Sequence, residues 1–352
     1  LERERGQEDQ ASYSLYKRRE GKVLEITKED LKKYANINSV ARNIRGAEDF
    51  TSEVMDYFLS GENMKGIELP FHALKNKFRL RSQELTVLSG INNSGKSLLA
   101  SQFVNLACNA GYKCLHVSLE MTPKHILARA WRQAGLVAEP TMQVGLEFTR
   151  WAKGKMWIYD QYGTIDPKTL MAVLRYAKDH CDIDLVLVDS LMTMSMNSDD
   201  WNGQKQVVQA LANAAKQLDV HIMLIAHARK GQSVREKLDR FSVAGSADIV
   251  NRCDNCIILS RNYDDPSSDA TLSLCKARHF DGAEMDIDLR LDMASLNFYT
   301  DDQMPEKILN VPAHGGPVGE LERVALNDNI HEITIRKTER AKTTAMGQVA
   351  LN

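Results

Sequence analysis

The chain has 352 residues and a formal net charge of −2, with 43% hydrophobic and 26% charged residues. This length fits one large α/β domain with an appendage, or two domains, and the hydrophobic content supports a sizeable core. The near-neutral charge excludes a globally basic surface, so any nucleic-acid contact must come from a local patch. No run approaches the roughly 18 apolar residues of a membrane-spanning helix, so no membrane association is expected.

The cysteines and the N-terminal sequence bear on the compartment. Six cysteines are scattered along the chain, and its start shows no secretory leader. Both features favour free thiols in a reducing cytoplasm over a disulfide framework. Cys253 and Cys256 have the CxxC spacing, but no second Cys or His pair lies nearby to complete a zinc site. The first residue is Leu1 and not Met, which is typical of a processed or trimmed chain.

The first 64 residues are predicted to be a leader and linker. Residues 1–26 are polar and lack periodicity, and short helices are expected at 27–34 and 47–60. The second helix carries an apolar stripe made of Phe50, Val54, Tyr57 and Phe58. This stripe has two interpretations, packing on the chain's own core or docking on a neighbouring subunit. A further short helix at 70–78 is expected to lead into the main domain.

The residues at 90–97 fit the phosphate-binding P-loop pattern, a glycine, four residues and Gly-Lys-Ser. They are Gly90, Ile91, Asn92, Asn93, Ser94, Gly95, Lys96 and Ser97. An apolar run at 85–89 predicts a buried strand before the loop, and helical spacing predicts a helix over 96–110 after it. Backbone N–H groups at that helix start would bind phosphate, Lys96 would reach the β- and γ-phosphates, and Ser97 would coordinate Mg²⁺. The pattern predicts binding of ATP, or another nucleoside triphosphate, with Mg²⁺.

From residue 84 to about 260, predicted strands alternate with predicted helices, which indicates a doubly wound parallel sheet. The strands are expected at 113–118, 155–159, 184–189, 220–226 and 255–260. The helices are expected from Thr122-Pro123 to a stop at Gly135, from Asp166-Pro167 to about His180, and over 204–218 and 246–253. Residues 271–299 are strand-rich and predict an antiparallel edge. Residues 301–352 are predicted to be a loosely attached tail.

Polar residues at the ends of predicted strands are the candidate site, because ligands of open α/β sheets lie at the carboxyl ends of the strands. Glu120, Asp189 and His227 each follow or end a strand, and Lys276 and Arg278 end the strand at 271–275. Asp189 follows a hydrophobic strand, as a Walker B aspartate that holds Mg²⁺ does. The other interpretation is an ordinary helix cap after a strand. Glu120 is a general base or a surface cap. His227 alone is more typical of a polar core residue.

Five motifs in a fixed order carry a resemblance to a known family. Ser-Leu-Glu-Met stands at 118–121, a strand ends at Asp189, and Ile-Ala-His-Ala-Arg-Lys stands at 225–230. Gly-Ser-Ala-Asp follows at 245–248 and Lys-Ala-Arg-His-Phe-Asp-Gly at 276–282. Over about residues 65–300 this resembles the RecA-like motor of superfamily 4 replicative helicases, above all the Twinkle-type and phage members of the DnaB group. The implied fold is a RecA-like P-loop NTPase with a doubly wound, mainly parallel sheet.

The resemblance also implies roles for the strand-end residues. Glu120 would be the catalytic base, and Asp189 with Ser97 would organise Mg²⁺. His227 would sense the γ-phosphate. Arg278 resembles an arginine finger supplied to a neighbour's ATP, with Lys276 beside it, so activity would require a ring, in this family usually a hexamer. His279 separates Arg278 from Phe280, whereas the Twinkle-type motif has Arg-Phe.

A basic segment at 228–244 is the candidate DNA-binding loop. Its basic residues are Arg229, Lys230, Arg235, Lys237 and Arg240. The resemblance implies a central-channel loop that follows the phosphates of one DNA strand. A solvated basic loop is the other interpretation. Phe241 is the one aromatic residue of the segment, so contacts to backbone charge and not base stacking are expected to dominate.

The leading hypothesis is a replicative DNA helicase motor, an ATP hydrolase that moves on single-stranded DNA and unwinds forked duplex DNA. Its expected partners are DNA, further copies of itself and a primase or loader, in the cytoplasm of a bacterial host if the chain is phage-encoded. One alternative is a RecA-like recombinase or recombination mediator that forms filaments on DNA. Another is a P-loop switch protein that does not act on DNA, against which the basic segment argues.

Overall fold

The computed structural model describes residues 46–59, 65–161, 163–191, 201–228, 247–263, 265–279 and 284–311. It also describes two short paired strands, β1 (Arg18–Arg19) and β2 (Lys22–Val23). The helix predicted at 27–34 lies outside these residues. So do the five basic residues of the candidate DNA loop and residues 312–352 of the predicted tail.

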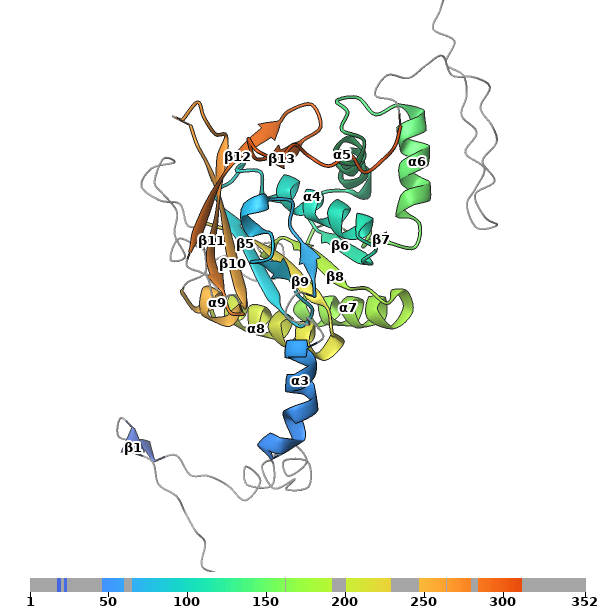
Figure 1. Ribbon diagram of the computed structural model, residues 1–352. Helices are drawn as coiled ribbons and strands as arrows, with labels where there is room; N and C mark the ends of the chain where they lie inside the picture. The colour runs from blue at the N-terminus through green and yellow to red at the C-terminus, as the bar shows by residue number, and fades with distance from the viewer. Residues whose placement is uncertain are drawn as a thin grey trace, which may run out of the picture.

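A nine-stranded sheet forms the centre of the domain (Figure 1). Its strands are β5 (Leu85–Gly90), β6 (Cys114–Ser118), β7 (Met156–Ile158), β8 (Leu185–Asp189), β9 (His221–His227), β10 (Asn255–Arg261), β11 (Ala270–Ala277), β12 (Met285–Asp292) and β13 (Asn297–Tyr299). They are arranged in the order β13-β12-β11-β10-β5-β9-β8-β6-β7. The six strands from β10 to β7 pair in parallel, and β11, β12 and β13 add an antiparallel extension. The predicted fold class is confirmed.

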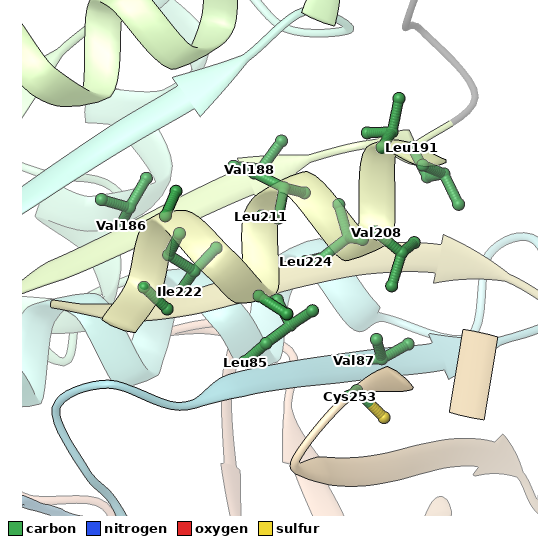
Figure 2. Packing of buried hydrophobic residues seen from close by; sticks show 14 of the residues in the cluster. Leu85, Val87, Val186, Val188, Leu191, Val208, Leu211, Ile222, Leu224 and Cys253 are labelled. Atoms are coloured by element: carbon green, nitrogen blue, oxygen red, sulfur yellow. The ribbon is translucent and has the colours of Figure 1, made fainter. Parts of the chain in front are cut away.

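Helices cover both faces of this sheet. They are α4 (Lys96–Asn109), α5 (Pro123–Gly135), α6 (Met142–Ala152), α7 (Pro167–Cys181), α8 (Trp201–Leu218) and α9 (Ala247–Arg252). Side chains of α7, α8 and α9 pack with one face of the sheet, and side chains of α4 pack with the other. Figure 2 shows Val208 and Leu211 of α8 lying among strand side chains. Each layer therefore excludes water from one face of the sheet.

The central strands read as unbroken apolar runs because both of their faces are covered. Successive residues of β8 alternate between the two cores: Val186 and Val188 belong to the α8 side, and Leu185 and Leu187 to the α4 side. All four are at most 1% exposed. This double burial fixes the register of β8, and with it the position of Asp189 at the end of the strand.

Helix α6 was not expected from the sequence. The Thr141 side chain caps its first turn by accepting a hydrogen bond from the backbone N–H of Val144. Helix α5 ends at Gly135, the predicted stop, and the next residue, Leu136, has φ of 51°. Gly135 lets α6 approach closely, since a Cβ there would lie 3.1 Å from Cγ1 of Val144. This glycine therefore serves the packing of α6 as well as ending α5.

The predicted helix at 47–60 is present as the 3₁₀ turn η1 (Ala47–Phe50) followed by α3 (Thr51–Leu59), which extends away from the sheet in Figure 1. Of the predicted stripe, Phe50, Val54 and Phe58 are 37%, 50% and 70% exposed. The apolar stripe therefore does not pack on the core of the domain in the described part of the chain, and this first interpretation is wrong. Docking on a neighbouring subunit stays a prediction.

The segment between α3 and β5 contains two short paired strands, β3 (Ile67–Glu68) and β4 (Arg79–Leu80). The helix predicted at 70–78 is reduced to the 3₁₀ turn η3 (His72–Leu74). Phe71, Leu74 and Phe78 are almost fully buried in the α4-side core. Burial of these three side chains, and not helical periodicity, therefore shapes the segment.

The first residues of the predicted tail are held to the domain. Leu309 and Val311 are 3% exposed and pack with the α5–α6 pair. The backbone N–H groups of Ile308 and Leu309 both donate to the carbonyl oxygen of Ala134, at 3.1 and 3.0 Å. The expectation of a loose tail is therefore wrong for residues 301–311, because this stretch supplies the apolar residues that complete a small core.

Candidate functional site

The P-loop connects the end of β5 to the start of α4. Gly95 has φ of 98°, a left-handed conformation that favours glycine, and a Cβ there would lie 2.8 Å from Cζ of Phe298 in β13. A Cβ at Gly90 would lie 2.3 Å from the carbonyl oxygen of Leu259 in β10. Both glycines are therefore required by close packing, against a side chain at Gly95 and against the backbone of β10 at Gly90.

Lys96 folds back over this loop. Its Nζ donates to the carbonyl oxygens of Gly90 and Ile91, at 2.9 and 2.6 Å, and the residue is 5% exposed. Burial lowers the pKa of Lys96 to about 8, although the carboxylates of Asp189 and Glu120 oppose this shift. The nearby carboxylates therefore do not fully compensate the ammonium group of Lys96 for the loss of water.

The loop residues fit a phosphate group. Within the described residues, the buried Oγ of Ser94 has no hydrogen-bond partner, and neither has that of Ser89. Lys96 brings a charge that burial alone disfavours. Phosphate oxygens would supply both the missing acceptor and the missing negative charge.

Glu120, Asp189 and His227 meet next to the P-loop, at what we call the P-loop end of the sheet. His227 pairs directly with Gly90 in the β5–β9 register, and Asp189 with Ser118 in the β6–β8 register. The distance from His227 Nε2 to Glu120 Oε1 is 3.8 Å. Residues that lie far apart in the sequence are thus brought together because three neighbouring parallel strands end at the same level.

The two carboxyl groups differ in their surroundings. The pKa of Glu120 is lowered, chiefly by the neighbouring His227 and also by a hydrogen bond that Ser190 donates at 2.5 Å. Asp189 is 3% exposed, and burial raises its pKa, while a hydrogen bond with Ser97 acts in the opposite direction. The Asp189 carboxylate beside the Ser97 hydroxyl is the pair of oxygen ligands that Mg²⁺ prefers, so these residues fit the metal.

Arg129 of α5 is a further member of this end of the sheet that the sequence did not reveal. Burial lowers its pKa, and the carboxylate of Asp189 acts in the opposite direction. Arg129 also contributes, after burial itself, to lowering the pKa of His116 in β6 to about 4. Helical spacing could place Arg129 on α5, but not the side of α5 that faces Asp189.

Lys276 and Arg278 lie at the opposite end of the sheet. Strand β11 runs antiparallel to β10, so Lys276 pairs with Cys256 near the start of β10, and Asn255 in turn pairs with Thr86 near the start of β5. The prediction that Lys276 and Arg278 lie at the same edge of the sheet as Glu120, Asp189 and His227 is therefore wrong. The sequence predicts that residues 271–276 form a strand, but not whether that strand runs parallel or antiparallel to its neighbour. The six residues of β5 separate the two ends of the sheet by about 16 Å.

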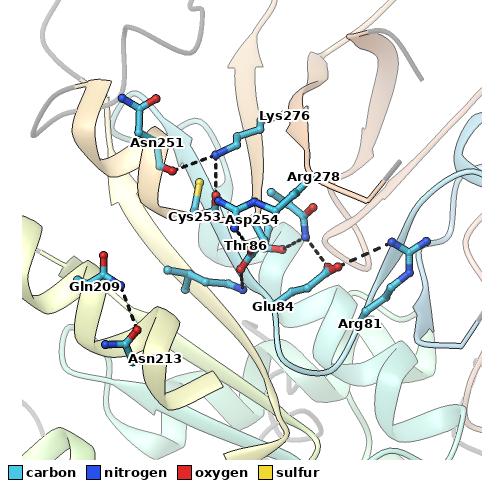
Figure 3. A network of polar contacts seen from close by, with 12 residues as sticks. Arg81, Glu84, Thr86, Gln209, Asn213, Asn251, Cys253, Asp254, Lys276 and Arg278 are labelled. Carbon is cyan, nitrogen blue, oxygen red and sulfur yellow. Dashed lines mark hydrogen bonds and ion pairs between the residues drawn. The ribbon is translucent and has the colours of Figure 1, made fainter. Parts of the chain in front are cut away.

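Both side chains are held within the subunit (Figure 3). Lys276 Nζ donates to the carbonyl oxygens of Val250, Asn251 and Cys253, at 2.7, 3.2 and 2.7 Å, at the C-terminus of α9. Arg278 Nη1 lies 3.2 Å from Oδ1 of Asp254. Neither cation reaches the P-loop of its own subunit.

The rest of the described chain offers neither a metal cluster nor a membrane span. Cys253 and Cys256 are buried thiols whose pKa is raised by burial. The described residues contain no group of three or more His, Cys, Asp or Glu that could hold a metal. None of the described helices is both long and apolar enough to cross a bilayer.

Comparisons with known proteins agree with this geometry. The family model described as "ATPase: KaiC" matches residues 70–281. The chain is 25% identical over 239 residues to the Twinkle homolog protein, chloroplastic/mitochondrial, of Arabidopsis thaliana, a match that covers 62% of this chain and 33% of that protein. The chain therefore spans about a third of the length of this curated relative.

Two solved structures share the fold at 16% sequence identity. One is described as an ATPase domain and has a TM-score of 0.64, with 73% of this chain and 99% of that chain covered. The other, a DnaB-like replicative helicase described with its interactions with primase, has a TM-score of 0.59, with 73% and 67% covered. The family match covers more than half of the chain, so the chain belongs to the KaiC family of ATPases.

Proposed function

We propose that this protein is an ATP-driven DNA helicase motor that assembles into a ring, moves along single-stranded DNA and unwinds duplex DNA. The observation that carries the proposal is the separation of Arg278 from the P-loop of its own subunit. A subunit that holds its triphosphate site at one end of the sheet and its arginine at the other can complete a site only with a neighbour.

At the P-loop end, each side chain has a chemical task. Lys96 binds the β- and γ-phosphates, and Ser97 with Asp189 would hold Mg²⁺, which neutralises phosphate charge when bound. Glu120 has a lowered pKa and is ionised at neutral pH, so it orients the attacking water and accepts its proton. His227 contacts Glu120 and precedes the candidate DNA loop, so it reports the state of the γ-phosphate to that loop.

Arg278 acts on the nucleotide of the adjacent subunit. An arginine finger stabilises charge in the transition state of phosphoryl transfer and increases the rate by roughly 10³- to 10⁵-fold. The exposed apolar residues of α3 dock on the neighbouring subunit and hold the ring together. Likeness to superfamily 4 motors favours a hexamer.

The segment between β9 and α9 contacts DNA. Ala228, where it begins, donates its backbone N–H to the carbonyl oxygen of Gly90 in the P-loop, at 2.9 Å. The five basic residues that follow would bind phosphates of one DNA strand without base preference. A change at the nucleotide is thereby linked to a change at DNA. A primase or loader is the expected protein partner, by analogy with the DnaB-like helicase.

A filament-forming recombinase is the alternative, because its subunits could also share sites head to tail. Electron micrographs on single-stranded DNA distinguish closed rings from open filaments. Forked duplexes with opposite single-stranded tails test unwinding directly, since a ring motor displaces a strand from one tail polarity only.

The DNA loop has its own test. Replacing Lys230 and Arg235 by Ala should weaken binding to single strands of any sequence, and lower the slope of log affinity against log salt by about 0.7 for each lost phosphate contact. The matched control replaces Lys168 and Arg175, exposed residues of α7, by Ala. An unchanged slope in the loop variant would mean that these charges do not contact DNA. Failure of single-stranded DNA to stimulate the ATPase would favour a switch protein.

A further inference from the structure

The buried carboxylate of Asp254 contacts Arg278 at the end of the sheet opposite to the P-loop. Asp254 is 2% exposed and lies two residues after the end of α9 at Arg252. Its Oδ2 accepts a hydrogen bond from the backbone N–H of Leu85 at 2.9 Å, and its own N–H donates to the Leu85 carbonyl oxygen at 2.9 Å. Asp254 is thus fixed to the first residue of β5 by its side chain and by its backbone.

The same residue holds Arg278 by two contacts. Oδ1 of Asp254 lies 3.2 Å from Nη1 of Arg278, and the Asp254 carbonyl oxygen accepts from the backbone N–H of Arg278 at 3.0 Å. The two oxygens of one carboxylate therefore have separate tasks, one toward the sheet and one toward the arginine (Figure 3).

The two partners differ in exposure. The side chain of Asp254 is 3% exposed, whereas that of Arg278 is 42% exposed. A guanidinium has five N–H donors in a planar arrangement, so one nitrogen can be held by Asp254 while other donors face outward. A buried, rigid anchor beneath a half-exposed arginine orients the cation without enclosing it.

Lys276 fixes the strand that carries the arginine. Its three bonds to the end of α9 attach β11 to residues 250–253, immediately before Asp254. The backbone of Arg278 therefore has little freedom, and the carboxylate restricts the side chain as well. Preorganisation of this kind avoids an entropic cost when the charge in the transition state develops.

We propose that Asp254 is a positioning residue, which holds the guanidinium of Arg278 at the subunit surface in the orientation that a neighbour's nucleotide requires. The proposal rests on the proposed action of Arg278 in trans. It adds that the finger is set before assembly, by its own subunit. Asp254 touches no nucleotide and acts only through Arg278.

Asp254→Asn is the informative variant. An asparagine oxygen can still accept from Leu85, but its amide N–H₂ then faces the donors of Arg278, so the link to β5 is kept and the hold on the arginine is lost. Glu84→Gln is the matched control, because Glu84 is buried in the same cluster and accepts from Asn255 at 2.9 Å. It undergoes the same loss of charge without contacting Arg278.

The measurement is DNA-stimulated ATPase with melting temperature, for single variants and for mixtures with Lys96→Ala subunits. Asp254→Asn should reduce kcat by about 10- to 100-fold, with the KM for ATP within about twofold of wild type, since a small misplacement of a catalytic group is costly. Mixing with Lys96→Ala, which has a defective pocket and an intact finger, should restore activity. Glu84→Gln should keep kcat near wild type.

Three outcomes separate the possibilities. A loss in Asp254→Asn that mixing does not restore means damage through β5 to its own P-loop, and overturns the proposal. An unchanged kcat overturns it as well, provided that Arg278→Ala is inactive and restored by mixing. An active Arg278→Ala refutes the trans finger itself. If Asp254→Asn does not fold, Asp254→Glu, which keeps the charge and moves it by one methylene, is expected to lower kcat in the same rescuable way.

Discussion

The two ends of the central sheet differ in how well their charged side chains are compensated by neighbouring groups. At the P-loop end, burial lowers the pKa of Lys96 and raises that of Asp189, so each group is less well stabilised in its ionised form than in water. At the opposite end, Lys276 has three carbonyl acceptors, and Arg278 has a buried carboxylate. One end is incomplete until a ligand arrives, and the other is complete within the subunit.

This difference suggests a division of labour. An incomplete site gains the most from binding triphosphate and metal, because they supply the missing charges. A complete and rigid site is suited to act on something outside the subunit, because its cations need no rearrangement. In a ring, the rigid end of one subunit would face the incomplete end of the next.

The largest effect is expected from the base at the P-loop end. Glu120→Gln removes the proposed general base and leaves Lys96, the proposed phosphate ligand, in place. Turnover should fall by about 10²- to 10⁴-fold, while binding of a fluorescent ATP analogue stays near wild type. Normal hydrolysis in this variant would show that another group is the base, and Arg129→Gln then tests whether the α5 arginine organises the site instead.

A smaller effect compares the two lysines in the absence of nucleotide. Folding lowers the pKa of Lys96 from 10.5 to about 8, so the unfolded chain binds this proton more tightly, and the folded state gains stability as pH rises from about 8 to 10.5. Lys96→Met removes this cost, and the variant should be about 2 kcal/mol more stable than wild type at pH 7, with the difference shrinking above pH 8.

Lys276→Met should act in the other direction. It removes the ammonium from three carbonyl groups at the end of α9, and should lower the free energy of unfolding by about 1–2 kcal/mol. Denaturant unfolding over a pH series measures both variants. If Lys96→Met is the less stable of the two at pH 7, the proposed contrast between the two ends is wrong.

Much of the P-loop end could be predicted from the sequence, since apolar runs buried on both faces mark the strands of a parallel sheet. A strand that ends in Asp189 or His227 then places that residue beside the P-loop. The opposite end could not be predicted in this way. The residues at 271–276 read as a strand whichever way it runs, and only its pairing with β10 places Lys276 away from the P-loop.

Other misses have a common cause in tertiary packing. Helix α6 was not predicted, and its Val144 packs against Gly135 at the end of α5. Phe71, Leu74 and Phe78 have apolar spacing close to that of a helix, yet they are buried around a short turn. Arg129 and Asp254 become site residues only through contacts with distant strands, which no local pattern contains.

Mixing two inactive variants tests the central claim, that each ATP site is shared between subunits. On the proposed mechanism, Lys96→Ala has a defective pocket with an intact finger, and Arg278→Ala has an intact pocket without a finger. In an equal mixture about a quarter of sites combine an intact pocket with an intact finger, so ATPase should rise well above either parent. Lys96→Ala mixed with Glu120→Gln is the control and should stay inactive, because both pockets are defective.

Energy transfer between labelled chains must first establish that subunits exchange in these mixtures. With exchange established, restored ATPase is the result that the shared site predicts. No restoration at any ratio of Lys96→Ala to Arg278→Ala would mean that Arg278 does not act on a neighbour's nucleotide, and would contradict the ring mechanism.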